Sequence, residues 1–174
     1  MKKILIVVDM QNDFIDGALG SVEAENIVDN CVNKILNFKG DIIATYDTHF
    51  SEYLSTMEGK NLPVPHCIKG TRGWELNANI QNALNEKNYH SIEKITFGSV
   101  ELPQFIKKNY NTDEIEVEFI GLCTDICVIS NALLLKANFP EMKISADPLC
   151  MAGVTVDKHN AAIEVMKSCH INIL

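Results

Sequence analysis

ILIVVD, residues 4–9, decides the fold, because five apolar and mostly β-branched residues run without interruption and then meet an aspartate. A strand with one face in water alternates apolar and polar residues, so an unbroken run indicates a strand buried on both faces. Strands of that kind belong to parallel sheets that helices cover on both sides. Similar runs occupy residues 41–46, 115–120 and 171–174, and two weaker ones occupy residues 89–95 and 142–145.

Helical patterns fill the stretches between these runs. In residues 24–38 apolar side chains recur at helical spacing, among them Ile27, Cys31 and Ile35, and Gly40 follows as a helix stop. Further helical patterns cover residues 74–84, 100–109, 125–138 and 156–168. Alternating strands and helices imply right-handed crossovers and helices on both faces of the sheet. The sequence therefore predicts a three-layer α/β/α, Rossmann-like fold with a mostly parallel, doubly wound sheet of six strands.

Length and composition limit the classes of protein that this chain can represent. Its 174 residues suit one domain, and no repeat, low-complexity tract or flexible linker marks a boundary, so we expect a single domain over 1–174. A net charge of −8, with 15 scattered Lys and Arg residues, argues against nucleic acid or an anionic membrane as a partner. We find no signal peptide or membrane span, and expect a cytoplasmic protein with free thiols.

Candidate catalytic residues follow the predicted strands. In a parallel sheet, ligands bind at the carboxyl ends of the strands, where loops and helix N-termini meet. Asp9 follows the first strand, Lys94 closes the third, and Cys127 falls in the first turn of the helix after the fourth. A helix N-terminus lowers the pKa of a thiol, and its free N–H groups could hold the oxyanion that forms when a thiolate attacks a carbonyl. Cys127 is therefore a candidate nucleophile.

Each of these three residues also has a plainer interpretation. A free cysteine is commonly a small buried hydrophobe, an aspartate at a strand end is at least as often a cap, and a single lysine usually lies on the surface. The catalytic hypothesis requires that the three side chains meet. Asp9 would then accept the proton of Cys127 and return it to a leaving amine, while Lys94 would keep the carboxylate ionised.

A second candidate site lies in the long polar stretch of residues 47–72. Four of its residues supply two imidazoles and two carboxylates: Asp47, His49, Glu58 and His66. Two histidines and a carboxylate with open positions suit a catalytic zinc, iron or manganese ion. The alternative is a pair of loop histidines that hydrogen-bond the loop to itself. The sequence predicts a divalent metal site, with zinc as the first choice and Glu58 as a ligand whose role stays open.

Four ordered motifs resemble those of the isochorismatase-like cysteine hydrolases, the superfamily of nicotinamidases, isochorismatases and N-carbamoyl amidohydrolases. The motifs are VDMQNDF at residues 8–14, HCIKGT at 66–71 with EL at 75–76, Lys94 ahead of TFGS at 96–99, and GLCTDICV at 121–128. The match runs nearly end to end. It implies the fold of that superfamily and a catalytic triad of Asp9, Lys94 and Cys127.

The resemblance implies further features of the site. The peptide between Leu122 and Cys123 would be cis and would aim the N–H of Cys123, with that of Cys127, at the oxyanion. Phe14 would line the substrate pocket, and the chain would form a homodimer or homotetramer. The metal ligands of the nicotinamidase branch, which isochorismatases generally lack, would be Asp47, His49 and His66. Glu58 lies where some relatives supply a further ligand.

Two positions depart from the nicotinamidase pattern. Nicotinamidases typically carry a tryptophan between the first two metal residues and another three positions before the second histidine. This chain has Thr48 and Pro63 at those places, so the wall that stacks on the substrate ring is altered. Nicotinamide is nonetheless the leading candidate substrate.

The sequence thus favours a cysteine amidohydrolase that releases ammonia from a small carboxamide through a thioester on Cys127. Isochorismatase-type hydrolysis of a vinyl ether and hydrolysis of an N-carbamoyl compound stay open as alternatives. So does a protein of another class, a catalytically idle binding module or a thiol sensor that uses Cys123 and Cys127. A dinucleotide site is disfavoured, because the first strand–helix turn has no G-x-G-x-x-G motif.

Overall fold

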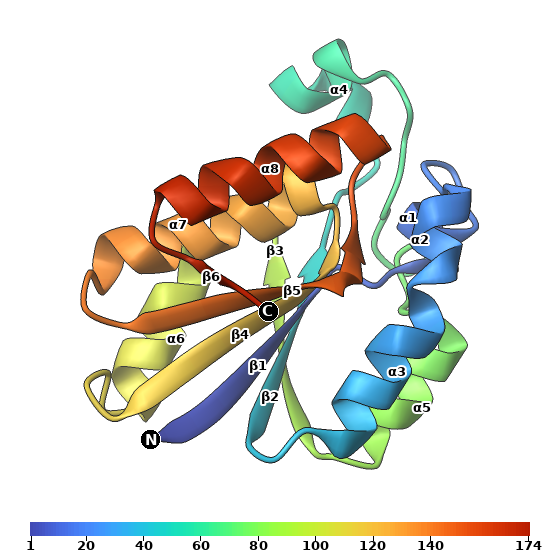
Figure 1. Ribbon diagram of the computed structural model, residues 1–174. Helices are drawn as coiled ribbons and strands as arrows, with labels where there is room; N and C mark the ends of the chain where they lie inside the picture. The colour runs from blue at the N-terminus through green and yellow to red at the C-terminus, as the bar shows by residue number, and fades with distance from the viewer.

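The computed structural model describes all 174 residues and contains one six-stranded sheet (Figure 1). The strands are β1 (Lys2–Val8), β2 (Asp41–Asp47), β3 (Tyr89–Lys94), β4 (Ile115–Leu122), β5 (Lys143–Ala152) and β6 (Asn172–Ile173). Their order across the sheet is β3-β2-β1-β4-β5-β6, and every neighbouring pair is parallel. The sheet is therefore parallel throughout, where the sequence predicted a mostly parallel one. The chain reverses its direction of winding between β1 and β4, which places a ligand crevice at their carboxyl ends.

Helices cover both faces of the sheet, as expected. On one side lie α1 (Asn12–Ile15), α2 (Val22–Asn26), α3 (Val28–Asn37) and α5 (Ala78–Asn85), and on the other α6 (Glu101–Asn109), α7 (Ile129–Asn138) and α8 (Val156–Ser168) (Figure 1). A 3-10 turn, η1 (Tyr53–Ser55), and the short α4 (Met57–Asn61) project beyond the sheet at the top of Figure 1. The predicted three-layer α/β/α architecture is confirmed.

Three of the predicted helices differ from those observed. The pattern over residues 24–38 is divided at Ile27 into α2 and α3. The pattern over residues 74–84 becomes helical only at Ala78, because Leu76 forms an antiparallel bridge with Gln11 and is extended. The pattern over residues 125–138 opens with a π turn, η2 (Thr124–Val128), before α7 begins.

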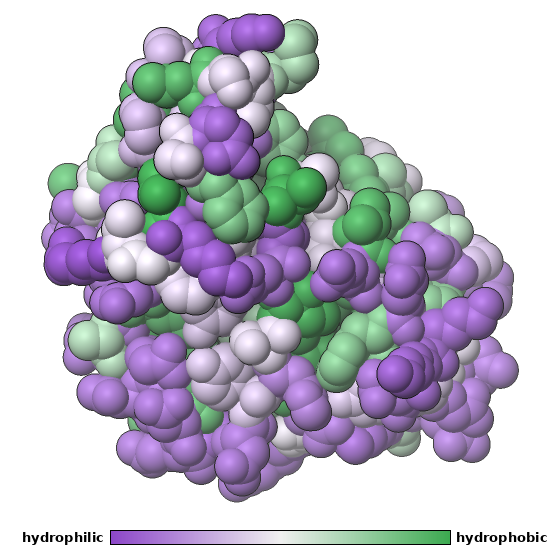
Figure 2. All heavy atoms as spheres, turned by 180° about the vertical axis from the view of Figure 1, so that it is seen from behind, coloured by the Kyte–Doolittle hydropathy of each residue, from purple (hydrophilic) through white to green (hydrophobic).

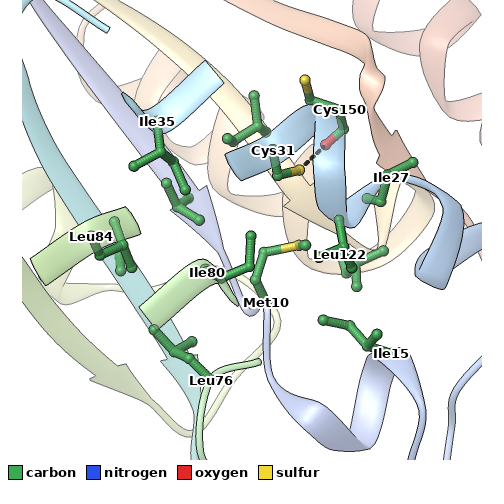
Figure 3. Packing of buried hydrophobic residues seen from close by; sticks show 14 of the residues in the cluster. Met10, Ile15, Ile27, Cys31, Ile35, Leu76, Ile80, Leu84, Leu122 and Cys150 are labelled. Carbon is green, nitrogen blue, oxygen red and sulfur yellow. Dashed lines mark hydrogen bonds between the residues drawn. The ribbon is translucent and has the colours of Figure 1, made fainter. Parts of the chain in front are cut away.

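The run that predicted the fold is buried on both faces. Leu5 and Val7 pack with α3 and α5, whereas Ile4, Ile6 and Val8 pack with α6, α7 and α8, and all five are fully inaccessible to solvent. Figure 3 shows the first of these two cores, in which side chains of α3 and α5 converge with residues that follow β1. Burial of this apolar surface is the main force that holds the layers together.

Hydrophilic residues cover most of the face shown in Figure 2, and apolar residues are exposed between them in small groups. None of the helices combines the length and the apolar composition that a membrane span requires. Inside the molecule, Gly121 lets β4 approach β1 closely: its φ is +114°, and a Cβ there would lie 2.1 Å from the carbonyl oxygen of Val8. This close approach brings the segment after β4 beside Asp9.

Candidate active site

Asp9 directly follows β1 and is completely buried. Its Oδ1 accepts a hydrogen bond from Thr45 Oγ1 at 2.6 Å, and its Oδ2 forms an ion pair with Lys94 Nζ at 2.6 Å. Its backbone N–H donates to the carbonyl of Thr45 at 3.2 Å. Burial raises the pKa of the Asp9 carboxyl above its ordinary value, although the charge of Lys94 lowers it. A carboxylate with increased proton affinity, held from both sides, suits the transfer of a proton.

Lys94 is the last residue of β3 and lies opposite Asp47 in the register of the sheet. Its Nζ is 2.6 Å from Asp9 Oδ2, 3.2 Å from Asp47 Oδ1 and 3.4 Å from Cys127 Sγ. Burial lowers the pKa of Lys94, but the charges of Asp9, Cys127 and Asp47 outweigh it, and the pKa lies above its usual range. The buried ammonium group therefore stays charged.

Cys127 lies in the π turn η2 and is only 4% exposed. Burial raises the pKa of its thiol well above the ordinary value, the charge of Asp9 raises it further, and Lys94 opposes the change. The sequence predicted a lowered pKa at this helix start, and that prediction is wrong for the resting site, because the loss of hydration outweighs the favourable dipole and the nearby ammonium. At rest, Cys127 is a neutral thiol beside a carboxylate that can take its proton.

The peptide between Leu122 and Cys123 is cis, as the resemblance implied. The Cys123 carbonyl accepts hydrogen bonds from the N–H groups of Ile126 and Val128, both at 3.1 Å, which close the turn around Cys127. Burial raises the pKa of the Cys123 thiol to about 12. Neither of the two neighbouring cysteines is thus a thiolate at rest, which disfavours the alternative of a reactive thiol sensor.

The four candidate metal ligands come together beside this triad. Ligand atoms of Asp47, His49, Glu58 and His66 all lie within 4.8 Å of one another. His49 Nε2 is 3.0 Å from Asp47 Oδ2 and 3.5 Å from Glu58 Oε1. His66 Nε2 lies 3.5 Å and 3.6 Å from the same two oxygens. Glu58, whose role the sequence left open, is therefore part of the cluster, and Asp47 contacts both this cluster and Lys94.

The orientation of the histidines tests whether the cluster fits a cation. His66 Nδ1 lies 2.8 Å from the carbonyl of Val64 and must donate to it, so Nε2 of the neutral ring carries a lone pair toward the cluster. Burial alone would lower the pKa of His49, but hydrogen bonds to Asp47 and Glu58 raise it to about 9. Two imidazoles facing two carboxylates therefore fit a divalent ion such as zinc, iron or manganese.

Two polar side chains, the buried Gln11 and the half-buried Asp13, support these residues, and the sequence reasoning assigned them no role. The Gln11 amide accepts from the Asp47 N–H at 2.7 Å and donates to the carbonyls of Asp47 and Trp74, both at 2.8 Å. Asp13 Oδ2 accepts from the N–H of Cys67 at 2.7 Å, directly after His66. Gln11 and Asp13 lie within the first sequence motif, which was the available signal.

Aromatic residues surround the two histidines. The ring of Tyr53 lies 4.7 Å from that of His49 and 5.0 Å from that of His66, and its hydroxyl donates to the carbonyl of Leu62 at 2.9 Å. Phe14, the predicted pocket residue, packs against His66 with a ring distance of 5.5 Å. No sequence pattern singled out Tyr53.

Thr48 and Pro63, the two departures from the nicotinamidase pattern, lie in different surroundings. Thr48 is buried, and its hydroxyl accepts a hydrogen bond from the indole N–H of Trp74 at 2.9 Å. Pro63 lies exposed in the loop that leads to His66. Neither residue presents an aromatic ring, so any aromatic wall of the pocket must come from other residues, such as Phe14 and Tyr53.

Comparisons with known proteins identify the family of this chain. The family model for the isochorismatase domain matches residues 3–174. The nicotinamidase/pyrazinamidase of Mycobacterium tuberculosis is 25% identical over 187 residues, covering 99% of this chain and 98% of that protein. An uncharacterised isochorismatase family protein of Bacillus subtilis is 32% identical over 143 residues, covering 76% of this chain and 78% of that protein.

Solved structures are similar over the whole chain. The crystal structure of a nicotinamidase/pyrazinamidase from Bacillus subtilis superimposes with a TM-score of 0.86 at 26% identity and covers 99% of both chains. The pyrazinamidase of Pyrococcus horikoshii in complex with zinc superimposes with a TM-score of 0.80 at 26% identity, covering 100% of this chain and 99% of that one. From its sequence, its fold and these relatives, the chain belongs to the isochorismatase family and is a hydrolase.

Proposed function

We propose that this protein is a cysteine amidohydrolase of the nicotinamidase type, which hydrolyses a small carboxamide to a carboxylic acid and ammonia. Nicotinamide, giving nicotinate, is the first candidate substrate. The observation that carries the proposal is the buried contact of Lys94 Nζ with both Asp9 Oδ2, at 2.6 Å, and Cys127 Sγ, at 3.4 Å. The named activities of the relatives and the adjacent metal-binding cluster support an amidase over a vinyl-ether hydrolase.

In the first half of the reaction, Asp9 accepts the thiol proton as Cys127 Sγ attacks the carbonyl carbon of the amide. The carbonyl oxygen becomes an oxyanion, which the backbone N–H groups of Cys123 and Cys127 stabilise. Asp9 then gives its proton to the amide nitrogen, the C–N bond breaks, and ammonia leaves. The acyl group remains as a thioester on Cys127.

In the second half, Asp9 accepts a proton from a water molecule that attacks the thioester carbonyl. The C–S bond breaks, the acid is released, and the proton returns to Cys127 Sγ, so the resting thiol is restored. Lys94 keeps Asp9 ionised at the start of each half-reaction and offsets the negative charge on sulfur.

Asp47, His49, Glu58 and His66 would hold a divalent cation, with zinc as the first candidate. When bound, the cation would supply a Lewis acid that receives an electron-pair donor of the substrate, such as a ring nitrogen. Phe14 packs on His66 and would line the pocket at this point. A cytoplasmic location and a homodimeric or homotetrameric assembly stay predictions from the sequence.

The proposal is tested by measuring ammonia release from nicotinamide, pyrazinamide, other small carboxamides and N-carbamoyl compounds, with and without a chelator. We expect turnover of a carboxamide that chelation abolishes and added zinc restores. Cys127→Ala should lower kcat by about 1,000-fold or more, because the nucleophile is lost. Cys169→Ala, a change to a partly exposed cysteine in another segment, is the matched control.

Rapid acid quenching followed by mass spectrometry should detect an acyl adduct on Cys127 during turnover. Undiminished ammonia release by the Cys127→Ala variant would refute the assignment of Cys127 as the nucleophile. Turnover of an N-carbamoyl compound alone, or of none of the amides, would refute the carboxamide assignment.

A further inference from the structure

Asn131, in the first turn of α7, is a completely buried polar side chain outside the triad and the metal cluster. Its Nδ2 donates to the carbonyl of Cys127 at 2.8 Å and to the carbonyl of Phe97 at 3.2 Å. Its Oδ1 accepts from the N–H of Ser99 at 2.8 Å. One amide thus joins two segments that are about thirty residues apart, and each of its three bonds ends on a backbone atom.

These two segments carry the two groups that must meet for catalysis. Residues 97 and 99 belong to the connection that leaves Lys94, while Cys127 is the nucleophile itself. Ile95 and Phe97 are 69% and 48% exposed, so their side chains contribute little to holding this connection against the protein. The loop is also closely packed on α7, because a Cβ on Gly98 would lie 3.2 Å from the carbonyl of Ser130.

We propose that Asn131 is a positioning residue, which fixes the Cys127 turn to the loop after Lys94 and thereby keeps Sγ within reach of Nζ and Asp9. The inference rests on the proposed function, since it assigns Asn131 a part in that same reaction. Asn131 bonds only to backbone, so it acts through the placement of other groups. A misplacement of about 1 Å at a reacting centre costs about 100-fold in rate, so loss of this link should reduce kcat.

Two substitutions distinguish the bond that Asn131 makes to Cys127 from the bonds that it makes to the loop after Lys94. A serine at a helical position can bond the carbonyl four residues earlier, so Asn131→Ser keeps the bond to Cys127 and loses those to Phe97 and Ser99. Asn131→Ala loses all three. The matched controls are Asn138→Ser and Asn138→Ala, because Asn138 lies in the same helix and also donates to a carbonyl four residues earlier, that of Leu134 at 2.9 Å, but is exposed and far from the triad.

The first measurement is steady-state kinetics with the carboxamide that the wild type turns over. We expect both Asn131 variants to lower kcat by about 10- to 100-fold with KM changed less than about 3-fold, and both Asn138 variants to stay within about 2-fold of the wild type. Melting temperatures of all variants show the fraction folded at the assay temperature. A folded Asn131→Ser variant with wild-type kcat would overturn the proposal, even if Asn131→Ala fails to fold.

The second measurement needs no substrate. Iodoacetamide labelling of Cys127 is followed by mass spectrometry as a function of pH in wild type and variants. Burial and the charge of Asp9 raise the pKa of Cys127, whereas the charge of Lys94 lowers it, so a displaced thiol should shift the pH midpoint of labelling in both Asn131 variants and in neither control. An unchanged midpoint would overturn the proposal. If the wild type hydrolyses no amide, the proposed function fails, while the labelling still decides whether Asn131 positions the thiol.

Discussion

Gly73→Ala tests whether the loop that carries His66 is held by Asp13. A Cβ at residue 73 would lie 2.1 Å from Asp13 Oδ2, and ordinary contact begins at 3.4 Å, so the carboxylate must retreat by about 1.3 Å. Its hydrogen bond to the N–H of Cys67 measures 2.7 Å and is lost beyond about 3.5 Å, a stretch of only 0.8 Å. The substitution should therefore release the backbone next to His66.

The expected cost follows from that broken bond. A hydrogen bond to a charged group contributes about 1.5–3 kcal/mol, so the free energy of unfolding of the metal-free protein should fall by about that amount. Zinc affinity should fall by about 10- to 100-fold, as is usual when a group supporting a metal ligand is lost. Equilibrium denaturation in urea measures the first quantity, and competition with a chromophoric chelator measures the second.

Gly70→Ala is the matched control in the same loop. Gly70 has a φ of +84°, and no atom lies within 4 Å of the position that a Cβ would occupy, so alanine there introduces backbone strain without touching Asp13. We expect this control to lose stability but to keep its zinc affinity. Equal zinc affinity in Gly73→Ala and the wild type would refute the reasoning.

Other contacts lead to three further predictions. Thr45→Val removes the 2.6 Å hydrogen bond that stabilises the ionised Asp9, so the pKa of Asp9 should rise. The acid limb of the pH profile of kcat/KM should therefore move to higher pH, and an unmoved acid limb would contradict this prediction. The raised pKa of His49, about 9, stabilises the metal-free fold fully below its ordinary value of 6.5 and progressively less as pH rises through 9. Zinc would have to displace the proton of His49 to bind there. Calorimetry should therefore show a zinc affinity that increases toward pH 9 and a release of protons on binding, and a zinc affinity that is independent of pH would contradict this prediction. Leu84→Ala, in the core of Figure 3, should lower the free energy of unfolding by about 2–5 kcal/mol in urea denaturation, and a loss below about 1 kcal/mol would argue against the packing described.

The sheet could be predicted from the sequence because burial on both faces leaves a local pattern, the unbroken apolar run of residues 4–8. The helix start at Ala78 could not be predicted in the same way. Residues 74–77 lie at the start of the pattern that predicted a helix over residues 74–84, but Leu76 pairs with Gln11, and the carbonyl of Trp74 accepts a hydrogen bond from the side chain of Gln11. Contacts between distant segments overrode the local preference there.

The candidate site could likewise be predicted from the sequence only in part. Parallel strands in register bring their carboxyl ends to one edge, so Asp9, Asp47 and Lys94 could be expected to meet. Thr45 bonds to Asp9, 36 residues away, and Asn131 bonds to Ser99, 32 residues away, as well as to Cys127 in its own turn. No sequence pattern indicates such long-range partners. The pKa of the Cys127 thiol was predicted with the wrong sign, because the extent of its burial depends on the packed structure.

Strand β1 separates two apolar cores, because its successive side chains point alternately into one core and into the other. Detaching either helical layer would bare one half of that strand to water, and the parallel partners on both of its edges would lose their support as well. The molecule should accordingly melt in one cooperative step, with the amides of β1 among the slowest to exchange with solvent. Because Asp9 follows this strand, the proposed catalytic carboxylate is anchored to the part of the chain that should open least often.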